Sequence, residues 1–124
     1  MRDTRPVNIA FTTFRLPLPA ITSFLHRVSG AFIFIGVAVL LYLLGLSLES
    51  PAGYRDAGGW INSLWGKLIV WMVLAGLIYH LVAGIRHLLM DMAIGDGLEG
   101  GLLGAQLVFV VSAIGIILAG VWLW

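Results

Sequence analysis

Residues 80–91, HLVAGIRHLLMD, are the first place to look for chemistry, because here ionisable side chains interrupt an apolar run. The preceding residues 68–79 read LIVWMVLAGLIY and carry no charge. At about 100° per residue on a helix, His87 and Asp91 lie within about 20° of His80 on one face. Ionisable residues in such apolar segments usually face a helix-bundle interior or a cavity. This face is therefore the first candidate site.

Two interpretations of His80 remain open from the pattern alone. In the first, the imidazole is neutral and hydrogen-bonds a neighbouring helix. In the second, it is an axial ligand of a haem iron. Gly76 and Gly84 lie within about 40° of His80 on the same face and would leave room for the flat macrocycle. The same two glycines are also compatible with a close approach of two helices.

A second polar cluster lies in residues 20–30, AITSFLHRVSG, at the start of another apolar run. Ser23 and Arg27 are four residues apart and share a helix face, with His26 beside them. A single arginine here is explained by an anchor at the membrane boundary. The combination of a hydroxyl, a permanent cation and an imidazole also suits the head group of a quinone, whose carbonyl oxygens accept hydrogen bonds while its tail stays in lipid.

The relative depth of the histidines limits how a haem can be held. Counted along antiparallel helices, His26 lies at about the depth of His87, and His80 lies deeper. We therefore expect that His26 and His80 do not clamp one haem between them, so that the opposite axial ligand comes from another chain. An alternative role for His26 and Arg27 is to pair with the haem propionates, which prefer the charged interface.

The elements that position these clusters are membrane-spanning helices. Of the 124 residues, 60% are hydrophobic and 10% are charged, with a mean hydropathy of +1.04, whereas soluble domains carry about 25% charged residues. About 20 apolar residues of helix cross a bilayer, and lipid offers no partner for open backbone groups. We predict an all-α membrane protein, a single three-helix domain over residues 1–124. The expected spans are residues 21–48, 63–92 and 101–124.

The distribution of basic residues predicts the orientation. If the helices run up, down and up, one side carries Arg2, Arg5, Arg15, Arg27 and Arg86. The other side carries Arg55 and Lys67, so the positive-inside rule places the N-terminus in the cytoplasm. The N-terminal residues resemble neither a cleavable signal nor a transit peptide, and we expect a bacterial inner membrane. A net charge of +1 does not favour nucleic acid, and the lack of cysteine excludes thiolate ligands and nucleophiles.

The segments around the second span are expected to connect and cap the helices. Residues 49–60, ESPAGYRDAGGW, are predicted to form a helix-breaking loop, with Asn62 or Ser63 as the cap of the following helix. Arg86 is expected to mark the cytoplasmic boundary of this span, as part of a solvated helix end. The third span is nearly featureless, which predicts a role in packing and anchoring.

Two longer motifs resemble a known family. RPVNIAFTTFRLPLPAITSFLHRVSG, residues 5–30, resembles the first signature of the cytochrome b556 membrane-anchor subunits of succinate dehydrogenase, respiratory complex II. HLVAGIRHLLMDMA, residues 80–93, matches the second signature, H-x3-G-x-R-H-x3-D. Both occur in order in a three-span chain of the expected length. Phe11, where an aliphatic residue is expected, is a minor departure.

The resemblance implies roles for the polar residues. His80 matches the haem b ligand, with the second axial histidine supplied by a partner anchor subunit. Ser23 and Arg27 match residues that line the ubiquinone site, and His26 and Arg27 match contacts to the haem propionates. The implied function is to pass electrons from the iron–sulfur subunit to quinone, with no catalytic residue for succinate on this chain.

The resemblance also implies an assembly. The partners would be a flavoprotein, an iron–sulfur subunit and a second three-helix anchor, which completes a larger helical bundle in the lipid. Two other functions remain. One is the anchor of a fumarate reductase that oxidises menaquinol. The other is a small proton-conducting membrane protein, in which His80, His87 and Asp91 relay protons.

Overall fold

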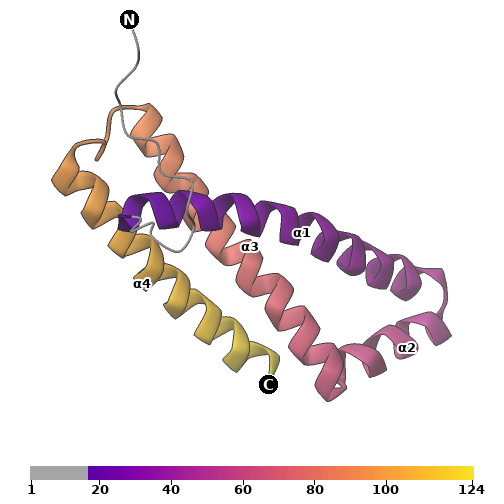
Figure 1. Ribbon diagram of the computed structural model, residues 1–124. Coiled ribbons are helices and arrows are strands. Elements are labelled where there is room, and N and C mark those ends of the chain that lie inside the picture. The colour runs from indigo at the N-terminus through magenta and orange to yellow at the C-terminus, as the bar shows by residue number, and fades with distance from the viewer. Residues whose placement is uncertain (1–16) are drawn as a thin grey trace, which may run out of the picture.

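The computed structural model describes residues 17–124, which form four helices and no strand (Figure 1). Helix α1 spans Leu18–Glu49, α2 spans Pro51–Asn62, α3 spans Leu64–Asp91 and α4 spans Leu98–Leu123. Even the 26-residue α4 is about 39 Å long, which exceeds the roughly 30 Å thickness of the bilayer hydrocarbon. The prediction of an all-α protein with three helices able to span a membrane is confirmed.

The three long helices leave much of their apolar surface uncovered by the chain itself. Their most apolar segments have mean hydropathies of 2.6, 2.3 and 2.5. Phe34 on α1 is 83% exposed and Leu98 on α4 is 97% exposed. Contiguous apolar surface of this kind marks contact with lipid or with another protein. The fold is therefore that of a multi-pass membrane protein.

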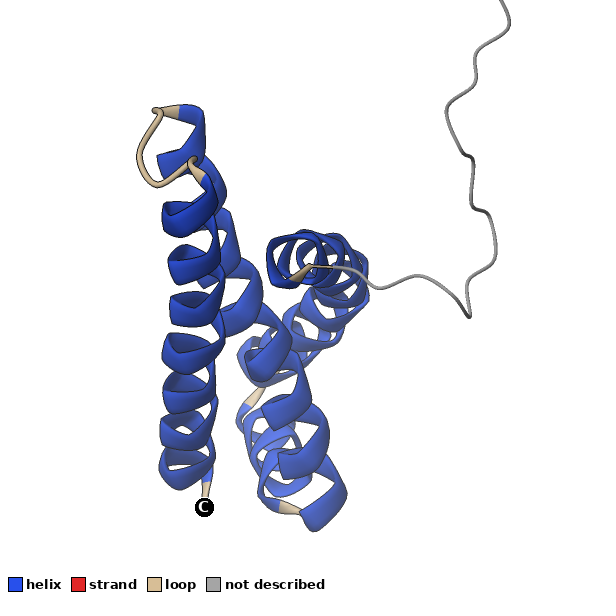
Figure 2. Ribbon diagram, turned by 60° about the vertical axis from the view of Figure 1, so that its left-hand side comes forward, coloured by secondary structure: helices blue, strands red, loops and turns tan. Residues whose placement is uncertain are grey.

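Helix α3 is the centre of the arrangement. Figures 1 and 2 show α4 running beside α3 in the opposite direction, whereas α1 crosses α3 obliquely. The indole Nε1 of Trp71 on α3 donates a hydrogen bond to the Ile116 carbonyl oxygen on α4, at 2.9 Å. The oblique crossing of α1 brings the residues of both polar clusters to one region of the fold.

Small residues allow α1 and α3 to approach closely. A Cβ atom on Gly76 would lie 2.7 Å from Phe32 Cδ1, and one on Gly36 would lie 2.9 Å from both Cγ atoms of Val73. Gly76 therefore serves the close approach of two helices rather than leaving room for a macrocycle. Gly84 differs, because its added Cβ would meet only His26 Nε2, at 3.4 Å.

We expect Gly76→Leu to destabilise the fold by about 1–3 kcal/mol, the usual cost of overpacking a contact. The thermal unfolding temperature in detergent micelles measures this effect. Gly45→Leu on α1 is the matched control, because nothing lies within 4 Å of a Cβ added there. Equal unfolding temperatures for the two variants would show that Gly76 is not needed for the crossing.

The prediction of a loop over residues 49–60 is wrong, because α2 occupies most of this segment. The Ser50 hydroxyl accepts a hydrogen bond from the Gly53 N–H at 2.9 Å, and Pro51 occupies the first helical position. Proline is favoured there, since its missing N–H would have no partner in the helix anyway. The predicted cap of the next helix is confirmed at Ser63, whose Oγ accepts from the Gly66 N–H at 3.0 Å.

Candidate functional site

Three histidine rings form a stack where α1 crosses α3. The ring of His26 on α1 lies 4.2 Å from the His80 ring, with 17° between the planes. It also lies 4.9 Å from the His87 ring, with 22° between the planes. Because His80 and His87 are two turns apart on α3, the imidazole of His26 fits between them.

This stack corrects the expected separation of His26 from His80. The sequence placed His26 level with His87, which agrees with the contact between those two rings. It also placed His26 away from His80, which is wrong because that count assumed antiparallel helices, and α1 crosses α3 obliquely (Figure 1). The expectation that His26 and His80 do not clamp one haem agrees with the geometry. Two rings in parallel van der Waals contact leave no space for an iron and its macrocycle between them.

The hydrogen bonds of His80 define which ring nitrogen is available. Its Nδ1 lies 3.1 Å from the His26 carbonyl oxygen and 3.1 Å from Ser29 Oγ. A carbonyl oxygen can only accept, so Nδ1 carries the proton and Nε2 keeps its lone pair. Among the described residues no hydrogen bond engages that Nε2. A histidine fixed through Nδ1 to a carbonyl is the usual form of a metal ligand.

The sequence analysis missed two residues that hold His80. The Ser29 hydroxyl donates to the His26 carbonyl oxygen at 2.8 Å and is within reach of His80 Nδ1. A Cβ atom on Gly30 would lie 3.0 Å from His80 Cε1, so a larger residue would displace the ring. Both belong to the HRVSG segment, and only their distance from His80 in space reveals their role.

A groove of about 360 Å³ opens beside the stacked rings. It is lined by His26, His80, Leu81, Gly84, Ile85, His87 and Leu88. Within residues 17–124 no group of three histidine, cysteine or acidic side chains converges on a metal ion. The unprotonated Nε2 of His80 beside this groove is a donor that would suit the iron of a haem.

The predicted quinone residues lie at the edge of this site. Ser23 Oγ is 3.4 Å from His87 Nε2, and His87 Nδ1 lies 3.1 Å from the Ala83 carbonyl oxygen of its own helix. The Ser23 hydroxyl therefore donates to His87. The Arg27 side chain is exposed, and so is Asp91 at the end of α3. Ser23 joins the histidine cluster, while Arg27 faces outward from the same helix.

The expected solvated position of Arg86 is wrong. Its side chain is only 7% exposed and lies between α3 and α4, because α4 begins beside it with glycines that leave room for the guanidinium. The orientation rested partly on Arg2, Arg5 and Arg15, and these residues lie outside the described part of the chain. The first signature is likewise described only from residue 17 onward.

Together, the fold and the site define an integral membrane protein with a histidine cluster at the crossing of two spanning helices. The comparison with known families agrees: the chain belongs to the succinate dehydrogenase/fumarate reductase transmembrane subunit family, whose model matches residues 1–119. The resemblance noted from the two motifs is thereby confirmed.

Individual relatives carry related names. The succinate dehydrogenase cytochrome b556 subunit of Coxiella burnetii is 41% identical over 125 residues, covering 100% of both chains. The cytochrome b556 subunit of Paracoccus denitrificans is 36% identical over 98 residues, covering 79% of this chain and 74% of the relative. The cytochrome b560 subunit of Reclinomonas americana is 30% identical over 97 residues, covering 73% and 67%. These similarities support a membrane-anchor role in a succinate dehydrogenase complex.

Proposed function

We propose that this chain binds haem b through His80 and forms part of the site at which succinate dehydrogenase reduces ubiquinone. The observation that carries the proposal is the hydrogen bonding of His80. Its Nδ1–H donates to a carbonyl oxygen, so Nε2 keeps a lone pair for a metal beside the groove. The cytochrome b names of the relatives support haem b as the group. A reduced-minus-oxidised absorption spectrum of the purified complex tests it, and a complex without a b-type signal would refute it.

The haem would be shared with a second three-helix anchor. His80 would hold the haem iron through Nε2, while the ring of His26 is stacked against the His80 ring. As the family resemblance implies, a histidine of the partner anchor would complete the site, and the exposed apolar faces of the helices offer a surface for such a chain. His26 and Arg27 supply an N–H donor and a cation for the propionates. When bound, the haem supplies a one-electron carrier close to the quinone.

Ser29 is proposed as the residue that positions His80. We expect Ser29→Ala to weaken haem binding about ten- to a hundredfold, the usual effect of losing a group that orients a metal ligand. Haem titration of the complex, isolated from haem-deficient cells, measures this affinity. Ser47→Ala is the control, because the Ser47 hydroxyl donates only to the Leu44 carbonyl oxygen of its own helix. If the haem affinity of Ser29→Ala is unchanged, Ser29 does not position His80, and the His26 carbonyl oxygen alone fixes its tautomer.

Quinone reduction would use the polar edge of the cluster. When quinone binds, the Ser23 hydroxyl would turn its single proton from His87 Nε2 to a quinone carbonyl oxygen, and the Arg27 guanidinium would stabilise the negative charge that develops as electrons arrive. His87, 3.4 Å from Ser23 Oγ, lies where it can exchange a proton with that hydroxyl. Succinate oxidation would belong to the flavoprotein subunit that the family resemblance implies. Its electrons would arrive through the iron–sulfur subunit.

The direction and location of the reaction follow the same proposal. The family description includes fumarate reductases, but the relatives are named as succinate dehydrogenase subunits, which favours ubiquinone reduction over menaquinol oxidation. Assays of the complex with each quinone discriminate between the two. A bacterial inner membrane with a cytoplasmic N-terminus fits the delivery of electrons from soluble subunits. The proton-conducting alternative predicts proton flux in liposomes that contain this chain alone.

A further inference from the structure

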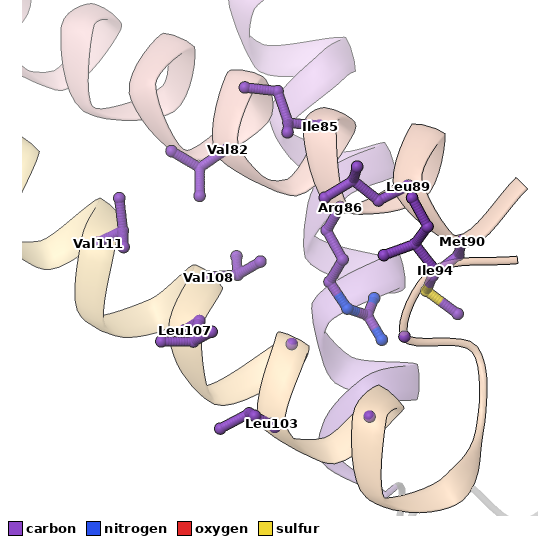
Figure 3. A pocket seen from close by; sticks show the side chains of 13 residues that line it. Val82, Ile85, Arg86, Leu89, Met90, Ile94, Leu103, Leu107, Val108 and Val111 are labelled. Atoms are coloured by element: carbon purple, nitrogen blue, oxygen red, sulfur yellow. The ribbon is translucent and has the colours of Figure 1, made fainter. Parts of the chain in front are cut away.

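Arg86 on α3 is a buried cation, and no side chain among residues 17–124 balances its charge. Figure 3 shows its guanidinium between α3 and the start of α4, among aliphatic side chains. One nitrogen, Nη2, donates to the Gly101 carbonyl oxygen at 3.2 Å. The other two, Nε and Nη1, are buried and have no hydrogen-bond partner within residues 17–124. Leaving donors of a charged group unpaired in this way is costly.

The neighbouring helix adds positive rather than negative potential. The guanidinium lies beside the first two turns of α4, where unpaired N–H groups make the helix end electropositive. Gly97 precedes this helix and provides no side-chain cap. Glu99, the acidic residue of the first turn, is exposed. A Cβ on Gly104 would lie 3.2 Å from Arg86 Nε, so glycine at this position makes space for the cation.

A cavity of about 310 Å³ adjoins the guanidinium. Of its thirteen lining residues, the twelve other than Arg86 are aliphatic residues, one methionine and glycines, and they include Leu89, Leu103 and Leu107. Its volume equals that of about ten water molecules at roughly 30 Å³ each. Leu103 and Leu107 are 57% and 51% exposed, so the cavity opens at the apolar surface of α4, where its walls favour hydrocarbon over water. A cation at one end of a hydrocarbon-lined cavity matches an amphiphile with an anionic head and an apolar tail.

We propose that this cavity, between α3 and α4, binds an anionic phospholipid. The Arg86 side chain would turn so that the covered Nε and Nη1 face the cavity and pair with the phosphate, and a segment of the acyl chain would fill the aliphatic cavity. Basic sites between spanning helices on the cytoplasmic side are the usual places for such head groups, and the orientation proposed above puts Arg86 toward that side. A side-chain carboxylate from a partner subunit would satisfy the charge but leave most of the cavity empty. The site shares only Ile85 with the histidine groove.

The test is lipid binding by the intact complex. The complex is delipidated in neutral detergent, mixed with phosphatidylglycerol or phosphatidylcholine, and its bound lipids are counted by native mass spectrometry. We expect Arg86→Gln to weaken phosphatidylglycerol binding about tenfold or more and to leave phosphatidylcholine binding unchanged. Lys67→Gln removes the same charge at the other end of α3 and should have no effect.

A second variant tests the proposal independently, in case Arg86→Gln fails to fold. Leu107→Trp keeps Arg86 and fills the mouth of the cavity, so it should also weaken phosphatidylglycerol binding while the assembled complex is recovered in normal yield. Equal binding of both lipids by the wild type, or equal phosphatidylglycerol binding by the wild type and both variants, would overturn the proposal. So would competition by millimolar inorganic phosphate, which would identify a free-anion site, or selective loss of a partner subunit in Arg86→Gln without a change in lipid binding.

Discussion

The His80→Leu complex is expected to lose its b-type absorbance completely in a reduced-minus-oxidised spectrum. Leucine has about the volume of the imidazole but offers no lone pair to iron. The variant should be made by co-expression with the partner subunits, so that the second half of the haem site is present. The amount of assembled complex, judged from its flavin content, normalises the spectra.

His87→Leu is the matched control for this experiment. His87 lies in the same stack, two turns along α3, but its Nδ1 faces the Ala83 carbonyl and its Nε2 faces Ser23. We expect this variant to keep its haem. A His80→Leu complex with full absorbance, or a His87→Leu complex without any, would show that the ligand has been assigned to the wrong histidine.

Arg27→Leu is expected to lower ubiquinone reduction about a hundredfold or more, the usual cost of removing a group that stabilises developing negative charge. Succinate oxidation with a soluble dye as electron acceptor should remain unchanged, because in the proposed path the dye takes the electrons before they reach the membrane subunits. The ratio of the two rates in the same preparation isolates the quinone step from any loss of assembly.

Two further variants define what Arg27 contributes. Arg55→Leu removes an equally exposed arginine on α2 and should leave both rates unchanged. Arg27→Lys keeps the charge but not the planar guanidinium, so an intermediate rate would separate charge from hydrogen-bond geometry. If Arg27→Leu reduces ubiquinone as fast as the wild type, Arg27 has no part in the quinone site.

The sequence by itself determined the class of protein and the segments that matter. Long uncharged stretches require helices in lipid, since no other local structure satisfies the backbone there. Two motifs at fixed spacing indicated the family. The ionisable residues His26 and His80 were candidates for the site because such groups are energetically costly in lipid and usually have a function there. These are properties of single segments, so they can be predicted from the periodicity and composition of the sequence.

The tertiary structure decided how those segments meet. Helix periodicity gives the face on which a residue lies but not the angle at which two helices cross, which depends on how their surfaces interlock. The close fit of Gly36 against Val73 and of Gly76 against Phe32 accompanies the oblique crossing of α1 and α3. That crossing inserts His26 between two turns of α3, a position that counting residues along antiparallel helices could not give.

The same reason explains the other differences. Ser29 acts on a residue 51 positions away along the chain, so no local pattern marks it as part of the site. Arg86 resembles an ordinary helix-end arginine in the sequence, and it becomes a buried cation only because the first turns of α4 pack over it. The polar residues could be identified from the local sequence, whereas packing between the helices determined which of their atoms remain free to bind.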